Sequence, residues 1–494
     1  MKRGWIIMCI LVFGIVGCKD FLNLVPKNKR VVANLEDVKT ELLTYLAAIT
    51  YSTGGLSPSY GGSVFRFPLY NDVATQLCLY EDDMNMSYYS DHSSIEEKAM
   101  NVYTECIDWK GVSLASVLWE KCYGAIGFLN VILDDLEKAG GYTQAEYETI
   151  TGEVKTIRAY YIFKLLQFFA PYNSDKLGIP LNLDSENVIP GGRLSQREVY
   201  RIVIRELEDV LEYETVREKW NIFYYPGIVK AILAQVYMFK AGSAAAEESD
   251  WANAEKYSGE LIAGYEPENR EDILFNMFSG TVREYQVGGA NYQLRMTYRI
   301  SCGFGDIFSG IWAEGKAQRV SNELLDMYDE EDIRREAWFK TEEEEGRTIH
   351  YINKPGYTRS INEVTVLFRT AEMYLINAEA KCRQNRVAEA KDMLETFKRA
   401  RIIGFENYSG EDVLGEILNE RRKEFCYEAG TRWVDMKRLG IGTSRVGMSK
   451  EGEGTEVYEL KSDDYRYALP IPNGVELDYN NKIEQNPGWG NLNR

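Results

Sequence analysis

The chain has 494 residues, of which 45% are hydrophobic, and its formal net charge is −19. A chain of this length and composition can bury a large core, while its acidity disfavours nucleic acid and anionic membrane surfaces as partners, because like charges repel. It contains only two histidines, His92 and His350, in unrelated contexts, which disfavours a histidine-based zinc site or a Ser-His-Asp triad. Neither a strand–helix phosphate loop nor an EF-hand loop occurs, so we expect no cofactor and no metal site.

The N-terminal segment has the features of a secretory signal. Lys2 and Arg3 give it a positive start, and the apolar run at 5–16 is too short to span a bilayer. We therefore expect residues 1–17 to be a signal peptide that is removed.

Gly17 directly before Cys18 resembles the lipobox of bacterial lipoproteins, in which the cysteine becomes the acylated N-terminus. An ordinary signal peptide with an incidental cysteine is the alternative. We expect Cys18 to be the lipid anchor and 18–34 to be a lipidated linker. Each buried methylene contributes about 0.8 kcal/mol, so several acyl chains would hold the protein permanently at a membrane.

From residue 35 onward, apolar residues recur at the spacing of amphipathic helices. The predicted helical hairpins span 35–50 with 113–138, 153–214, 226–264 and 362–402.

The hairpin at 362–402 shows the pattern most clearly, because Tyr374, Ala378, Ala390, Leu394 and Phe397 fall at the spacing of a tetratricopeptide repeat. One hairpin cannot bury its own apolar face, so several should stack. The sequence therefore predicts a mainly α fold, a tetratricopeptide-like scaffold within a single domain at 35–494. A generic all-helical core would give the same periodicity.

Two stretches, 51–112 and 265–360, lack a helical period and are rich in aromatic residues and glycine. Long loops on a rigid scaffold often carry binding residues, and aromatic rings can pack on the C–H faces of sugar rings. With 34 tyrosines in the chain, most must belong to the scaffold. The candidate ligand-binding residues are Tyr80, Tyr88, Tyr89, Tyr285, Tyr292, Arg295, Phe304 and Trp312.

Several separate motifs, in the same order, resemble those of the SusD/RagB family of outer-membrane lipoproteins. The most specific is 420–435, with the pattern E-R-R-x-E-x-x-x-E and then R-W-x-D, although Ala429 stands where the family usually has glycine. The matching segments are 18–26, 119–126 with Asn130, 153–161, 319–335, 362–402, 420–435, 469–472 and 485–488.

This resemblance implies a variable ligand-binding half on tetratricopeptide-like helices, and a SusC-like TonB-dependent outer-membrane transporter as partner. It implies a non-catalytic lipoprotein, exposed at the surface of the outer membrane, which captures oligosaccharides and delivers them to that transporter. The RagB branch of the family leaves a peptide cargo as the alternative. A surface hydrolase is a third hypothesis, which the scarcity of histidine disfavours.

The C-terminal helix and tail at 410–494 carry Glu420, Glu424 and Glu428, which we expect on one helix face. A glycosidase needs two carboxylates about 5–10 Å apart, one with a raised pKa, whereas neighbouring arginines keep carboxylates ionised. With Arg421, Arg422 and Arg432 in reach, we interpret this group as a structural ion network. The same interpretation applies to Glu372, Glu379 and Arg369, and Trp433 is expected to be a core anchor. Whether 81–83 binds calcium is left open.

Overall fold

The computed structural model is mainly helical, which confirms the predicted fold class. The signal peptide, the Cys18 anchor and the linker lie outside the part of the chain that it describes. The described residues are 34–50, 77, 81–83, 114–185, 191–263, 281–287, 290–296, 320–344, 347–352, 368–428, 430–448, 455–472 and 483–490.

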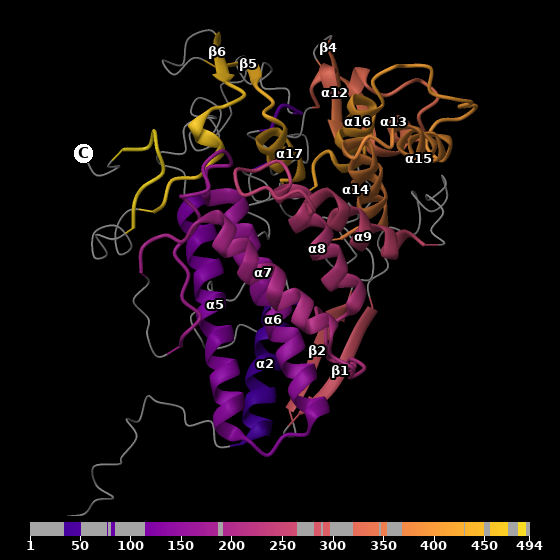
Figure 1. Cartoon of the computed structure of the whole chain (residues 1–494). Helices are drawn as coiled ribbons and strands as arrows, with labels where there is room; N and C mark the ends of the chain where they lie inside the picture. The colour runs from indigo at the N-terminus through magenta and orange to yellow at the C-terminus, as the bar shows by residue number, and fades with distance from the viewer. Residues whose placement is uncertain are drawn as a thin grey trace, which may run out of the picture.

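Four helices build the first half of the scaffold. α6 begins before the predicted residue 153, because Thr143 and Glu146 form a capping box that starts it. Ser195 and Glu198 form a second capping box at the start of α7. These helices pack in sequence order, α2 on α5, α5 on α6 and α6 on α7 (Figure 1). Their bounds are α2 Leu35–Thr50, α5 Leu114–Ala139, α6 Gln144–Phe169 and α7 Gln196–Leu211.

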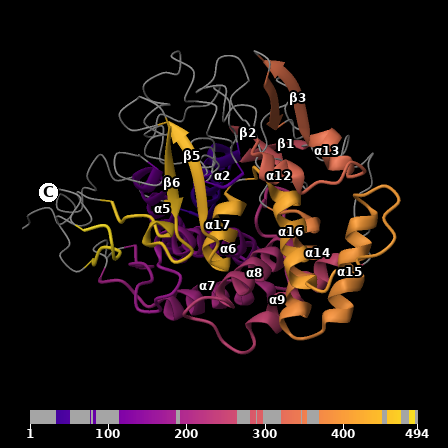
Figure 2. The same ribbon diagram turned by 90° about the horizontal axis from the view of Figure 1, so that it is seen from above.

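Two further hairpins, α8–α9 and α14–α15, continue this stack. α8 packs on α9, α9 on α14 and α14 on α15, and from above α5 to α9, α14 and α15 follow one curved row (Figure 2). In α14–α15, Ala378, Ala390 and Leu394 share one buried cluster, and the rings of Tyr374 and Phe397 stack at 5.9 Å. These are the residues of the predicted repeat. The bounds are α8 Pro226–Lys240, α9 Asp250–Ile262, α14 Thr370–Arg383 and α15 Val387–Arg399.

The expected single C-terminal helix is divided into α16 (Val413–Phe425) and α17 (Thr431–Leu439). The chain turns between them with positive φ at Tyr427 (59°) and Gly430 (75°). A Cβ atom at position 430 would lie 2.5 Å from the Leu77 side chain, so glycine is required there both by conformation and by space.

The described strands form three antiparallel two-stranded hairpins. Two of these hairpins lie in the stretch at 265–360, which was expected to be irregular. They are β1 (Thr281–Val287) with β2 (Ala290–Met296), β3 (Phe339–Glu344) with β4 (Arg347–Ile352), and β5 (Thr443–Met448) with β6 (Thr455–Leu460). The remaining short elements are α12 (Asn322–Asp326), α13 (Ile333–Trp338) and η3 (Tyr465–Tyr467).

The main core unites the long helices with the C-terminal tail, through residues such as Leu469 and Trp489. Within the described ranges, Cys122 and Cys382 carry free thiols, and the sulfur atom of Cys426 lies 3.5 Å from the Tyr328 hydroxyl. None of the helices in those ranges combines the length and the apolar character that crossing a membrane requires.

Candidate functional site

Most of the predicted ligand-binding residues lie outside the described part of the chain, namely Tyr80, Tyr88, Tyr89, Phe304 and Trp312. The remaining three lie in the β1–β2 hairpin, where residue 285 is paired with residue 292 and residue 295 with residue 282. Positions 292 and 295 are an odd number of residues apart on β2, so they belong to opposite faces of the hairpin. The register therefore brings Tyr285 and Tyr292 together and separates Arg295 from them.

The β1–β2 hairpin packs against α2. Figure 1 shows it at the lower end of the molecule, whereas α12 and α16 lie at the upper end. The hairpin that carries positions 285 and 292 is therefore distant from α12 and α16. The role of Tyr285 and Tyr292 in ligand binding stays a prediction.

Segment 81–83 is held against the C-terminal motif and against the second loop stretch. The Asp83 carbonyl oxygen accepts hydrogen bonds from the backbone N–H of Ser321 and from the hydroxyl of Tyr427, both at 2.8 Å. Arg422 on α16 donates through Nε to Asp83 Oδ1 at 2.8 Å and through Nη1 to Glu323 Oε1 at 3.0 Å. We call this set of contacts the loop junction, because it joins parts of both predicted loop stretches.

The acidic side chains of 81–83 have a structural role in this junction. Arg432 on α17 forms a bidentate pair with Asp82, at 2.7 and 2.6 Å, and the Trp433 N–H donates to Glu81 Oε1 at 3.2 Å. Burial, reinforced by the negative charge of Asp83, raises the pKa of Glu81 to about 8. Among the described residues, no group of three or more His, Cys, Asp or Glu side chains is placed to hold a metal ion.

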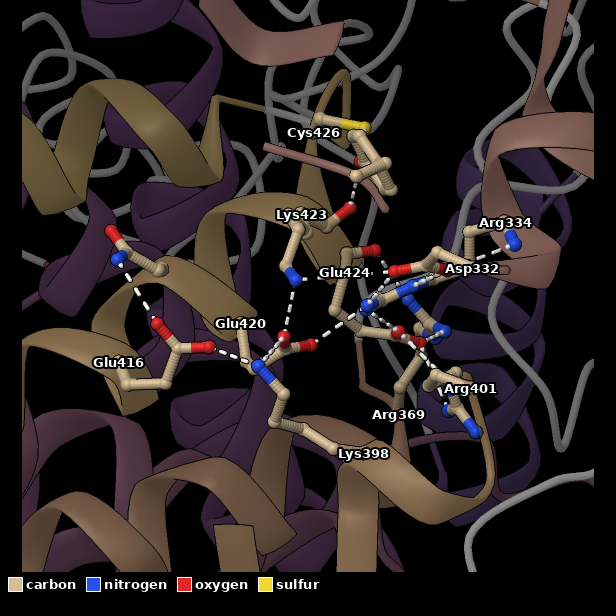
Figure 3. Close-up of polar contacts among 12 residues, drawn as sticks. Asp332, Arg334, Arg369, Lys398, Arg401, Glu416, Glu420, Lys423, Glu424 and Cys426 are labelled. Carbon is tan, nitrogen blue, oxygen red and sulfur yellow. Dashed lines mark hydrogen bonds and ion pairs between the residues drawn. The ribbon is translucent and has the colours of Figure 1, made fainter. Parts of the chain in front are cut away.

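A second, larger ion network lies where α13, α14, α15 and α16 meet (Figure 3). At its centre Arg334 contacts Asp332 and Glu420 at 2.7 Å and Glu424 at 3.1 Å. Burial alone would raise the pKa of Glu420, but the charges of Arg334, Lys423 and Lys398 lower it to about 2.

The expected ion network is therefore present, but the arginines expected to pair with the ladder have other partners. Arg421 pairs with Glu372 at 3.0 Å and with Asp435 at 2.9 Å, because it lies one residue, or about 100°, around the helix from Glu420. Arg422 and Arg432 hold 81–83 instead.

Glu428 also departs from the expectation, since it lies beyond the end of α16 rather than on its face. It contacts Arg369 at 2.7 Å, and Arg369 also pairs with Glu424. Two other predictions for this region are confirmed. Glu379 takes part in an ion pair, with Arg438 at 2.8 Å, and Trp433 is buried in the core.

Neighbouring cations lower the pKa of Glu420 and of Glu424, which makes both carboxylates poor proton donors. The network around Arg334 therefore stabilises the scaffold rather than forms an acid–base pair. The residues that sequence reasoning missed are Arg422, Tyr427 and Ser321, which tie both loop stretches to the scaffold. Arg422 was visible in the motif at 420–435, but its partners at 83 and 323 are distant in sequence.

Two family models match separate parts of the chain. The model described as SusD family matches residues 347–489. The model described as starch-binding associating with outer membrane matches residues 67–237. No curated protein matches the chain.

Solved structures share the fold over nearly the whole chain. A SusD superfamily protein from Bacteroides thetaiotaomicron superposes with a TM-score of 0.67 at 20% identity, covering 92% of this chain and 100% of that chain. A SusD-like carbohydrate binding protein from Bacteroides vulgatus gives 0.62 at 19% identity, covering 91% and 97%. A SusD superfamily protein from Parabacteroides distasonis gives 0.62 at 18% identity, covering 91% and 99%. The two family models together match residues 67–237 and 347–489, and they show that the chain belongs to the SusD/RagB family.

Proposed function

We propose that the protein is a surface-exposed, non-catalytic lipoprotein, anchored in the outer membrane through acylated Cys18. It captures oligosaccharides and delivers them to a SusC-like TonB-dependent transporter. The observation that carries this proposal is the match of residues 67–237 to a family described as starch-binding and associating with the outer membrane. A carbohydrate-binding protein with the same fold adds to it.

The loop junction supports a ligand site to which both stretches contribute. Tyr80 is bonded directly to Glu81, Tyr89 follows Asp83 by six residues, and Trp312 precedes Val320 by eight. An extended chain spans at most about 3.6 Å per residue, so only short segments of chain connect these aromatic residues to the junction. Tyr285 and Tyr292 lie on the β1–β2 hairpin, at the other end of the molecule, and would form a separate contact.

Binding without catalysis is consistent with the charge pairing. In the two described networks, Glu420, Glu424 and Asp82 are each held by at least one guanidinium group. A ligand that depends on ring stacking and hydrogen bonding would be released chemically unchanged, as delivery to a transporter requires.

Affinity electrophoresis of the mature protein through gels that contain starch or other polysaccharides tests the binding proposal. We expect particular glycans to retard the wild type, and Trp312→Ala and Tyr89→Ala to weaken that retardation. Tyr465→Ala is the matched control, because Tyr465 is an exposed aromatic residue on η3, outside both loop stretches. Equal retardation of all variants would remove Trp312 and Tyr89 from the site.

Two further experiments test the anchor and the partner separately. Cys18→Ala should release the protein from the membrane fraction, and retention of this variant there would contradict acylation at Cys18. Purification of the anchored wild type in mild detergent should recover a TonB-dependent barrel with it, and its reproducible absence would contradict the proposed transporter partnership.

A further inference from the structure

We propose that Arg422 is a positioning residue for ligand binding, which holds segments 81–83 and 320–323 together as one unit on α16. Ligand affinity would then depend on Arg422, although its side chain is only 9% exposed. This inference rests on the proposed function, and it adds a residue that no aromatic or loop pattern in the sequence indicates.

The guanidinium group of Arg422 bridges two segments that are far apart in the chain. Toward the first it contacts Asp83 Oδ1 at 2.8 Å and Asp82 Oδ2 at 3.3 Å, and toward the second Glu323 Oε1 at 3.0 Å. The guanidinium group is rigid and planar, and its several N–H donors can fix the relative position of several carboxylates. The single ammonium group of a flexible lysine does this less well.

The backbone adds a second link at the same place. The Ser321 N–H donates to the Asp83 carbonyl oxygen at 2.8 Å, while Ser321 Oγ accepts from the Leu324 N–H at 3.2 Å and caps α12. The Val320 N–H donates to the His350 carbonyl oxygen at 2.9 Å, which extends the unit to β4. Segment 81–83, α12 and β4 are therefore connected directly through hydrogen bonds.

Loss of Arg422 should loosen this unit without dissolving the whole scaffold. The scaffold keeps its other buried pairs, such as Arg334 with Glu420 and Arg438 with Glu379. Preorganised loops bind ligands more tightly because less conformational entropy is lost on binding. A loosened junction should therefore lower affinity even when no ligand contact is removed.

Hydrogen exchange and calorimetry of the folded, full-length mature protein test this inference. The main variant is Arg422→Met, with Arg422→Lys as the conservative replacement. Arg158→Met is the matched control, because Arg158 is also buried and pairs with Glu206, but it lies on α6 and contacts α5 and α7. Affinity is measured for the glycan that retards the wild type.

A second pair of variants guards against misfolding of Arg422→Met. Ser321 has φ of −64°, which proline adopts without strain, so Ser321→Pro removes the N–H donor to Asp83. Ser321→Ala is its control, because both variants lose the hydroxyl cap and only proline loses the N–H.

We expect Arg422→Met to speed exchange in peptides that cover 81–83 and 320–326 together, and to weaken affinity by about tenfold or more. Arg422→Lys should change the exchange rate and the affinity less than Arg422→Met does, and Arg158→Met should leave the exchange rate and the affinity unchanged. Ser321→Pro should speed exchange and weaken affinity more than Ser321→Ala does. The inference is wrong if folded Arg422→Met and Ser321→Pro leave hydrogen exchange in either segment unchanged, or leave glycan affinity unchanged. That result would not affect the proposed function. Failure of the wild type to bind any oligosaccharide would overturn the proposed function and this inference with it.

Discussion

Arg334 and Glu420 form an ion pair at 2.7 Å in which both side chains are completely buried. They come from α13 and α16, so the pair connects a short helix within the second loop stretch to the C-terminal motif. Asp332 and Glu424 complete the coordination of the same guanidinium group. Such a pair is costly to break from one side, because the remaining charge stays buried.

Arg334→Met should therefore lower the free energy of unfolding by about 3–5 kcal/mol, since it leaves three carboxylates without their central partner. Urea denaturation followed by circular dichroism measures this loss. Arg399→Met is the control, because the Arg399 side chain that pairs with Glu395 is 49% exposed, and its loss should change stability by at most about 1 kcal/mol. Equal losses in the two variants would contradict the central role of Arg334.

Glu420 should make the protein sensitive to acid. Its pKa in the folded state is about 2, below its value in the unfolded chain, so its contribution is complete above the unfolded pKa of about 4.3. That contribution is lost as the pH falls from there toward 2. Glu420→Gln should be less stable than the wild type at pH 7 and should lose less further stability between pH 5 and pH 3.

Glu81 should have the opposite pH dependence. Its folded pKa of about 8 lies above the unfolded value, so the folded state retains a proton that the unfolded chain releases. Its stabilising contribution is present below about pH 4.3 and is lost as the pH rises toward 8. Glu81→Gln, which resembles the protonated acid, should be more stable than the wild type at pH 8, and the difference should shrink at pH 5. A constant difference across this range would contradict the assignment.

The helical scaffold could be predicted because its signals are local. Tyr374, Ala378, Ala390, Leu394 and Phe397 each occupy a position that the period of two packed helices requires, and the structure buries all of them. The start of α6 at Gln144 was also readable, since Thr143 and Glu146 have the spacing of a capping box, but the prediction placed it at 153.

The ion partners could not be predicted because they depend on tertiary contacts. Glu424 has charge partners in Arg334, Arg369 and Arg401, on segments that sequence spacing cannot bring together. The division of α16 from α17 depends on Gly430 fitting over Leu77, which is another long-range contact. The candidate ligand-binding residues were chosen because their stretches are rich in aromatic residues. Composition does not show that the β1–β2 hairpin, with positions 285 and 292, packs against α2 rather than near α12.

The packing of the α14–α15 hairpin gives a further prediction. Leu394 is completely buried beside Ala378 and Ile417, so Leu394→Ala should cost about 2–5 kcal/mol of unfolding free energy. Val387→Ala, at the 44% exposed start of α15, is the control and should cost much less. Chemical denaturation measures the unfolding free energy of both variants. A small loss of unfolding free energy in Leu394→Ala would contradict the repeat-like packing.

Calorimetric titration of the purified mature protein, with oligosaccharide fractions and peptide fractions side by side, tests the central claim most directly. We predict saturable binding of an oligosaccharide, recovered chemically unchanged afterwards, and no heat of binding from the peptides. Saturable binding of peptides alone, or release of shorter sugars from the bound glycan, would contradict the account.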